Sequence, residues 1–563
     1  MTRGNIKKEK LTVYIEEEFM KKKFALLLSV MLTMGLLAGC GGGSSAPASG
    51  GGSGESAAAA TEAAAPAASG DEDILYHSYH SQPYVTLDPS TEYSNGIMIL
   101  GNVYETLTHY NDQTGELEPL LATEWGSDDG GLTWVFKLRD DVTFHDGSKM
   151  TAETVKKSID RTITLGQGAS FNWDPVESVE VTGDYEVTIK CQWPAPIDLV
   201  SSAGYAAYIM SENVIDKDTE WFNEGNDGGS GPYMIDTATG NNTVILKAYE
   251  DYRGGWADDQ YKVVLIKESS ESSVRRQLLE TGEAQLSDNF STTDLDALRQ
   301  ETENLYNYNA STWNNAIVFL NCQKAPCDNQ DFRKALQYAF PFEDTVNGVM
   351  DGTAVESIGL VPFGMWGHSD DIFKYNCDLE KAKEYLDKSG VDVNGLTLEC
   401  TYGANYPEYS GLVQIWQANL KELGISLDVR SMEWDAQWAA AQATNNEDRQ
   451  DIFIMRWWPD YASPASWFDS LVKSEDSVQF NLAYINDPEL DAMIEEADAA
   501  VATDRAHAEE LYIEIQQKLA DEAYMINMFD DSRAYIVSKS ITGVYENPGY
   551  STVVPYYNIK KAQ

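Results

Sequence analysis

Residues 132–155, LTWVFKLRDDVTFHDGSKMTAETV, contain the clearest local signals for the fold. Residues 134–138 are rich in aromatic and branched side chains, so they predict a strand. Asp146-Gly147 is a typical turn pair, and Thr151 is a typical N-cap for a helix with Glu153 in its first turn. A strand, a turn and a helix in such close succession indicate an α/β protein.

Outward from this block, strand and helix signals are interspersed. Strands are predicted at 186–190 and 243–247, and the apolar positions of 332–340 share one helical face. A helix over 412–424 is followed at once by a strand at 425–429, which is typical of a mostly parallel or mixed sheet with helical cover. Further helices are predicted after Asp378 and after Asp487-Pro488, and a strand at 533–538. If this C-terminal tail rejoins the first part of the chain, two lobes are joined by crossovers at a hinge, with a cleft between them.

Charge and composition exclude several classes of protein. The chain has 563 residues, enough for two to four core units, with 40 Lys+Arg against 90 Asp+Glu and a net charge of −50. Such a surface repels phosphate backbones, so we expect no nucleic-acid partner. An apolar content of 43% predicts a folded protein, and six cysteines are too few for a disulfide scaffold.

The first 73 residues differ from the rest. Lys21, Lys22 and Lys23 precede an apolar run at 24–38, which is too short to span a bilayer and is typical of a signal peptide. The run ends in Leu-Ala-Gly-Cys40, which resembles a bacterial lipoprotein signal. The resemblance implies cleavage before Cys40 and a lipid on its sulfur; the alternative is a short membrane anchor with an incidental cysteine. We expect a signal peptide at 1–39, with a natural start at Met20, and a lipid-attachment residue with a flexible Gly/Ser/Ala tether at 40–73.

A block of motifs in a fixed order carries a family resemblance. The motifs are VYETL at 103–107, TGELEPLLA at 114–122, GLTWVFKLR at 131–139, VTFHDG at 142–147 and TAETV at 151–155, followed by GSGPY at 229–233 and FRKAL at 332–336. The chain resembles the extracytoplasmic solute-binding proteins of the oligopeptide, dipeptide and nickel class of ABC importers. The resemblance covers roughly residues 74–563.

The resemblance implies a two-lobed periplasmic-binding-protein fold with an extra subdomain, in which mixed β-sheets with helical cover enclose an interlobe cleft. We expect lobe I at 74–311 plus 529–563, with an inserted subdomain, and lobe II at 312–528. The implied role is a non-enzymatic, monomeric receptor without cofactor, lipid-anchored on the outer face of the cell membrane. Its implied partners are a small solute and ABC permease subunits with their ATPases.

Residues 456–464, RWWPDYASP, form the candidate ligand loop. It contains a lone carboxylate among aromatic side chains, which is poorly solvated and favours a cationic partner. In peptide-binding members of the family, an Asp of this loop anchors the ligand amine, and Asp460 is the matching position. The alternative is that Asp460 caps the turn at Tyr461. Trp457, Trp458 and Tyr461 are expected to form aromatic walls.

Three further residues are weaker candidates. Arg456 has the geometry to hold a ligand carboxylate, or it is an exposed partner of an acidic residue. Trp434 matches a family position near the cleft, with a buried structural role as the alternative. Tyr79 lies on the first strand, which in the family bonds the ligand through its main chain; the alternative is a packed strand residue.

Other chemistry has little support. His77 and His80 would point to opposite faces of a strand, so no metal site is expected, and a structural role is expected for His145. Cys322 and Cys327 are near enough in sequence for a disulfide, although a small buried side chain at 327 is favoured.

The leading hypothesis is the capture of short peptides and their delivery to a permease. One alternative keeps the fold and role but takes an oligosaccharide, a nickel chelate or another small molecule. A remote alternative is a secreted hydrolase, for which no local motif argues.

Overall fold

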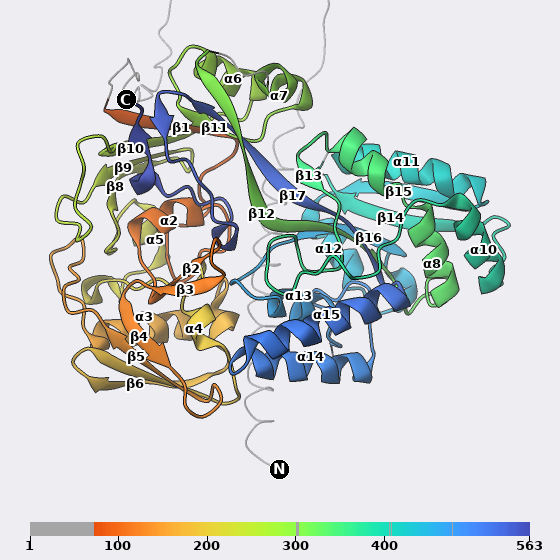
Figure 1. Cartoon of the computed structure of the whole chain (residues 1–563), viewed down its shortest axis with the longest axis horizontal. Helices are drawn as coiled ribbons and strands as arrows, with labels where there is room; N and C mark the ends of the chain where they lie inside the picture. The colour runs from red at the N-terminus through yellow and green to blue at the C-terminus, as the bar shows by residue number, and fades with distance from the viewer. Residues whose placement is uncertain (1–72, 300–302, 405, 407, 476) are drawn as a thin grey trace, which may run out of the picture. The chain divides into compact units, whose positions relative to one another are not determined.

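The computed structural model describes residues 73–299, 303–404, 406, 408–475 and 477–563. An eleven-stranded mixed sheet runs through them (Figure 1). In spatial order its strands are β15 (Ser426–Met432), β14 (Thr397–Gly403), β16 (Ile452–Trp457), β12 (Leu305–Leu320), β17 (Met525–Ser538), β11 (Leu286–Ser287), β1 (Ile74–Tyr79), β10 (Val263–Glu268), β9 (Thr243–Ala248) and β8 (Tyr233–Thr239), with β13 (Ala354–Val355) paired to β17. Strand β14 is parallel to both of its neighbours, β1 is parallel to β10 and β11, and the other pairs are antiparallel. The predicted α/β class with mixed sheets and helical cover is confirmed.

Two long antiparallel strands, β12 and β17, connect the two ends of this sheet. Figure 1 shows them running between the elements around β1 and those around β14. Residues 315–320 of β12 are buried and pair with β16 as well as with β17. The register of β12 on β17 is interrupted between Ser311 and Asn315, and Trp313 in this bulge has a φ of 51°. The bulge therefore lies on the strand by which the chain passes from one end of the sheet to the other.

The segment quoted first forms part of a separate antiparallel sheet. Its strands are β4 (Ala122–Gly126), β5 (Thr133–Leu138), β7 (Glu186–Cys191) and β6 (Val176–Gly183). Helix α3 (Ala152–Leu165) packs against β6 and β7. The side chain of Thr151 caps its first turn as predicted, and Gly166 ends it in the left-handed conformation.

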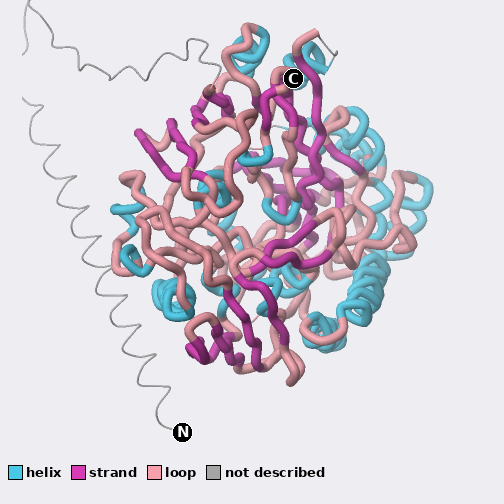
Figure 2. Tube along the Cα trace, turned by 60° about the vertical axis from the view of Figure 1, so that its left-hand side comes forward, coloured by secondary structure: helices cyan, strands magenta, loops and turns pink. Residues whose placement is uncertain are grey.

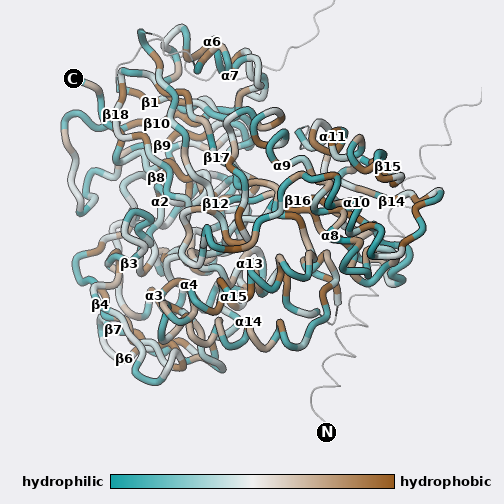
Figure 3. The backbone as a smooth tube through the Cα atoms, turned by 45° about the vertical axis from the view of Figure 1, so that its right-hand side comes forward, coloured by the Kyte–Doolittle hydropathy of each residue, from teal (hydrophilic) through white to brown (hydrophobic). Residues whose placement is uncertain are grey.

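Helices cover both faces of the sheet around β14 and β16. One core contains Trp416 and lies beneath α8 (Gln330–Ala339), α10 (Leu379–Ser389) and α11 (Glu408–Glu422). The other contains Trp467 and lies beneath α13 (Ala465–Leu471), α14 (Pro488–Val501) and α15 (Arg505–Glu522). Asp378 and Asp487 cap α10 and α14 as predicted. Figure 2 shows a group of strands running through the middle of the molecule with helices to the right of it, and further strands at the lower edge. Figure 3 shows hydrophilic and hydrophobic residues alternating along α14 and α15.

The remaining elements are short. They are α2 (Ile97–Val103), β2 (Thr108–Asn111), β3 (Glu116–Pro119), α4 (Ile197–Val200), α5 (Thr219–Asn223), α6 (Ser272–Glu280), α7 (Thr292–Arg299), α9 (Phe342–Asp344), α12 (Trp434–Ala441), β18 (Ile541–Thr542) and β19 (Lys560–Lys561). No helix in the described part of the chain is long and apolar enough to cross a membrane. The expected signal peptide, Cys40 and the tether lie outside the described residues.

The predicted strand at 533–538 is only the second half of β17, which begins at Met525. Two adjacent carboxylates, the buried Asp530 and the partly buried Asp531, interrupt the apolar pattern in its first half, so that the strand is not apparent from the sequence. Asp530 accepts hydrogen bonds from the Ser357 hydroxyl at 2.5 Å and the Phe363 main-chain N–H at 2.8 Å, and Asp531 pairs with Arg456. These partners come from distant segments, so they allow charged residues in an interior strand.

Candidate ligand-binding site

The loop after β16 is held by the first turn of α13. The main-chain N–H of Asp460 donates to the Ser466 hydroxyl at 3.2 Å, and that hydroxyl donates to Asp460 Oδ2 at 3.0 Å. The Trp457 indole donates to the Ser466 carbonyl at 3.2 Å. Asp460 therefore has a defined position, fixed by a helix that packs into the Trp467 core.

The electrostatic state of Asp460 is unusual for an aspartate. Burial raises its pKa to about 6, and the Ser466 hydroxyl opposes this shift only in part. No lysine, arginine or histidine of the described ranges forms an ion pair with it, although 40 cationic residues are present in the sequence. A carboxylate that is poorly solvated and has no cation beside it is stabilised by any positively charged group that reaches it.

Asp460 lies close to residues from the other end of the sheet. Burial raises the pKa of the Tyr205 phenol, and the negative charges of Glu92 and Asp460, together with Tyr79, raise it further. Tyr79 is the last residue of β1 and is 1% exposed. Asp460 and Tyr79, which are 381 positions apart, thus both lie within electrostatic reach of Tyr205, and the Tyr79 side chain is packed in the core.

The aromatic candidates of this region form a connected series. Trp434 stacks on Trp438 with ring centroids 5.3 Å apart, and Trp438 contacts Phe480 at 5.1 Å. Phe480 in turn contacts Trp457 at 4.9 Å, and Trp457 stacks on Trp458 at 6.4 Å. The end members Trp434 and Trp458 are 44% and 40% exposed, so the series presents aromatic surface at both ends.

Tyr461 lines a cavity of about 410 Å³. One wall comes from Pro175 and residues 193–196, and the other from α13 and α14. Near it, Arg505 of α15 donates to Asp198 of α4 at 2.6 Å, and Asp198 is buried. This ion pair joins α4 to α15, which packs with α13 and α14 in the Trp467 core.

Arg456 lies close to two carboxylates of the protein, although its buried Nε makes no hydrogen bond. Its Nη2 lies 2.9 Å from Glu408 Oε1, and its Nε lies 3.0 Å from Asp531 Oδ2. The guanidinium also lies over the Tyr406 ring, 4.8 Å from its centroid. The structure therefore places Arg456 next to the loop as the partner of two carboxylates.

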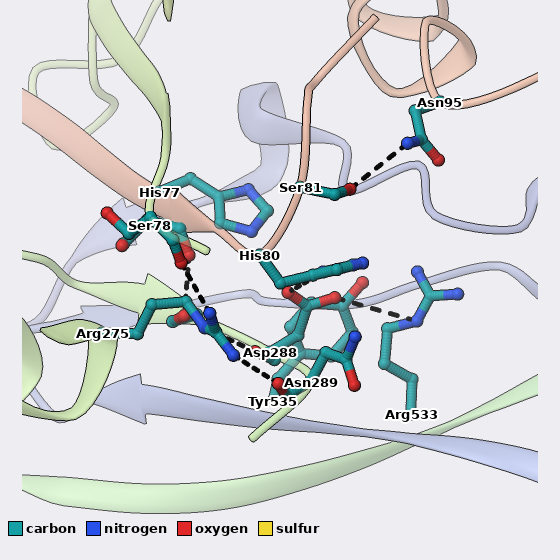
Figure 4. A network of polar contacts seen from close by, with 12 residues as sticks. His77, Ser78, His80, Ser81, Asn95, Arg275, Asp288, Asn289, Arg533 and Tyr535 are labelled. Atoms are coloured by element: carbon teal, nitrogen blue, oxygen red, sulfur yellow. Dashed lines mark hydrogen bonds and ion pairs between the residues drawn. The ribbon is translucent and has the colours of Figure 1, made fainter. Parts of the chain in front are cut away.

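Sequence reasoning missed a charged cluster behind β1, shown in Figure 4. Asp288 lies 2.9 Å from His80 Nδ1 and 3.9 Å from Arg533 Nε. Arg533 Nη1 lies 3.7 Å from Glu546 Oε1. The available signal was a lone arginine at the start of a predicted strand, where an inward-facing cation needs a special partner.

The histidines and cysteines have separate roles. His77 contacts the Tyr556 hydroxyl at 2.8 Å, away from the contact of His80 with Asp288, and no group of three metal-ligating side chains occurs among the described residues. His145 lies 2.5 Å from Asp227 and 2.9 Å from the Gly231 carbonyl, where it braces the GSGPY turn. Cys322 and Cys327 are free thiols, and Cys327 is buried, as favoured.

Comparisons with known proteins agree with this architecture. The probable D,D-dipeptide-binding periplasmic protein DdpA of Escherichia coli K12 is 27% identical over 481 residues, which cover 82% of this chain and 90% of that protein. The periplasmic binding protein DppA of Helicobacter pylori, solved with the peptide STSA, has a TM-score of 0.71 at 21% identity and covers 87% of this chain and 98% of its own. NikZ of Campylobacter jejuni, solved with Ni(L-His), has the same TM-score at 19% identity, with coverage of 87% and 99%.

The similarities to the two solved structures show the fold. The two structures carry a peptide and a nickel chelate on the same architecture, so fold alone does not select the solute. A family model for bacterial extracellular solute-binding proteins, family 5, matches residues 116–479, which is more than half of the chain. The chain therefore belongs to the bacterial extracellular solute-binding proteins of family 5, the non-enzymatic substrate-binding components of ABC transporters.

Proposed function

We propose that this protein captures short peptides through a free amino group and delivers them to an ABC permease. The observation that carries the proposal is Asp460, a carboxylate with a pKa of about 6 and no cation of the described chain paired to it. A peptide ammonium supplies that cation and forms a charge-assisted hydrogen bond. The names of DdpA and of the DppA complex, which refer to peptides, support the same solute class.

The architecture suits capture by closure of two lobes. We assign lobe I to residues 74–311 plus 529–563 and lobe II to 312–528, with β12 and β17 as the crossing strands. The end of β1 at Tyr79 then approaches the ligand from lobe I, while Asp460, Trp457, Trp458 and Tyr461 approach it from lobe II. Closure buries the solute and presents a closed surface to the permease, whose partner ATPases hydrolyse ATP.

We further propose that Cys40 carries a lipid and that residues 41–70 tether the folded part to the outer face of the cell membrane. A Cys40→Ser variant is expected to lose membrane association, and mass spectrometry of the wild-type N-terminus is expected to find diacylglycerol on this cysteine. Recovery of unmodified wild-type protein, uncleaved before Cys40, would contradict the anchor.

The solute is tested most directly by mass spectrometry of small molecules released on denaturing the purified protein. Peptides in the eluate support the proposal, whereas an oligosaccharide or a metal chelate would overturn it. Calorimetry with a dipeptide and its N-acetyl form then tests the amine contact. We expect acetylation to weaken binding by about 10- to 100-fold, the range of a lost charge-assisted hydrogen bond.

A further inference from the structure

Ser466 contacts the Asp460 loop at three points. Its hydroxyl donates to Asp460 Oδ2 at 3.0 Å and accepts from the Asp460 main-chain N–H at 3.2 Å, while its carbonyl accepts from the Trp457 indole at 3.2 Å. Ser466 lies in the first turn of α13 and is 5% exposed. One buried serine therefore holds both the carboxylate and an aromatic wall of the candidate ligand site.

The two oxygens of the Asp460 carboxylate differ in their contacts. Oδ2 accepts the Ser466 hydroxyl, whereas no donor of the described residues bonds Oδ1. Asp460 is only partly buried, so Oδ1 is the oxygen available to a solute. The last torsion of an aspartate side chain is broad, so a bond to one oxygen restricts the direction of the other. Ser466 therefore determines where Oδ1 points.

Ser466 is in turn held by the interior of the protein. Trp467, the next residue, is fully buried, and its indole donates to Asn315 Oδ1 at 3.0 Å. The Asn315 side chain donates to the Leu360 carbonyl at 2.8 Å. Asn315 lies on β12, directly after the interruption of its register with β17. The position of Ser466 is therefore set by the sheet and its core, and it does not depend on a bound solute.

The Ser466 hydroxyl also favours the charged form of Asp460. Burial raises the pKa of Asp460, and the hydrogen bond from Ser466 lowers it. The phenols of Tyr205 and Tyr461 lie within electrostatic reach of Asp460, and burial raises the pKa of both, so they are neutral between pH 5 and 7.5. Since these neutral phenols add no charge, a change at Ser466 is expected to act on Asp460 directly.

We propose that Ser466 is a positioning residue for solute binding: by holding Asp460 Oδ2, its hydroxyl directs Oδ1 at the amino group of the peptide. This inference rests on the proposed capture of peptides through a free amino group. Ser466 acts through Asp460 and not through a contact of its own with the solute. Loss of its hydroxyl is therefore expected to reduce the preference for a free amine and to leave the binding of a blocked peptide unchanged.

The test is a cycle of proteins and ligands measured by calorimetry at pH 7.5. Wild type, Ser466→Ala and Ser470→Ala are each titrated with the dipeptide alanylalanine and with its N-acetyl form. Ser466→Ala is expected to bind alanylalanine about 3- to 10-fold more weakly than wild type does, the range of one lost hydrogen bond, and to bind the N-acetyl form as wild type does. Ser470 is a partly buried serine one turn further along α13, so Ser470→Ala is the matched loss of a hydroxyl and should change neither affinity.

The pH profile provides a readout that a purely structural role would not change. Alanylalanine affinity is measured from pH 5 to 7.5, below the pKa of the peptide amine at about 8. The pH below which affinity falls is expected to lie about half a unit to one unit higher in Ser466→Ala than in wild type, because the hydroxyl no longer stabilises the charged carboxylate. Ser470→Ala should follow the wild-type profile.

Three results would overturn the inference. If Ser466→Ala weakens both ligands by the same factor, the serine supports only the fold. If the variant keeps both the wild-type preference and the wild-type pH profile, its hydroxyl does not position Asp460. In these two cases the preference of wild type for the free amine, and with it the proposed function, still stands. If wild type itself binds the dipeptide and its N-acetyl form equally, amine capture is excluded and the role of Ser466 falls with it.

Discussion

Replacing Asp460 by Asn is expected to stabilise the ligand-free protein while abolishing peptide binding. Burial raises the pKa of Asp460 to about 6, against an ordinary aspartate value of about 3.9. A difference of roughly 2 pKa units corresponds to at most about 3 kcal/mol at pH above 6, since each unit is about 1.36 kcal/mol. The neutral amide avoids this cost and keeps a similar shape.

The gain in stability from Asp460→Asn is expected to depend on pH. Because the folded protein binds the Asp460 proton more tightly than the unfolded chain does, this residue lowers wild-type stability as pH rises from about 4 to 6. The advantage of Asp460→Asn is therefore expected in full at pH 7.5 and absent at pH 4. Urea denaturation followed by tryptophan fluorescence measures both free energies of unfolding.

Asp530→Asn serves as the matched control. Burial likewise raises the pKa of Asp530 to about 6, but Asp530 accepts two hydrogen bonds within the protein and lies outside the Asp460 loop. This variant is expected to retain peptide binding. The reasoning is refuted if Asp460→Asn is less stable than wild type at pH 7.5, or if its advantage persists unchanged at pH 4.

Four further outcomes are expected. Peptide affinity should fall about tenfold per pH unit below 6, measured by calorimetry, since protonation of Asp460 in the free protein competes with ligand; a flat profile from pH 7 to 5 would count against the amine contact. Trp458→Ala should weaken binding and leave stability within about 1 kcal/mol, because the ring is 40% exposed, whereas Trp467→Ala in the core should cost about 3–5 kcal/mol in urea denaturation. Asp198→Asn should speed ligand dissociation by removing the 2.6 Å contact with Arg505, and an unchanged stopped-flow rate would exclude this pair from closure. Cys377 should react fastest with a maleimide among the five described cysteines, because three others are buried and Cys322 is partly so; peptide mapping that finds Cys400 labelled first would contradict the fold.

Local structure could largely be predicted from the sequence. The helix caps at Thr151, Asp378 and Asp487 were predicted and are present, because a cap depends on one side chain and the three residues after it. The strand at 525–532 could not be predicted, because Asp530 and Asp531 are accommodated there by partners that lie far away in the chain.

The candidate site, too, could be predicted from the sequence only in part. A lone carboxylate among tryptophans and prolines marked Asp460 from the sequence alone, since the chemistry of one loop was enough. Arg456 and Arg533 were indistinguishable at that level, because each is one arginine on a strand. Only the tertiary structure gives Arg456 two carboxylates within 3.0 Å and places the carboxylates of Asp288 and Glu546 at 3.9 and 3.7 Å from Arg533. Whether a charged side chain has a close ionic partner depends on contacts between distant segments of the chain. The local sequence does not determine those distances.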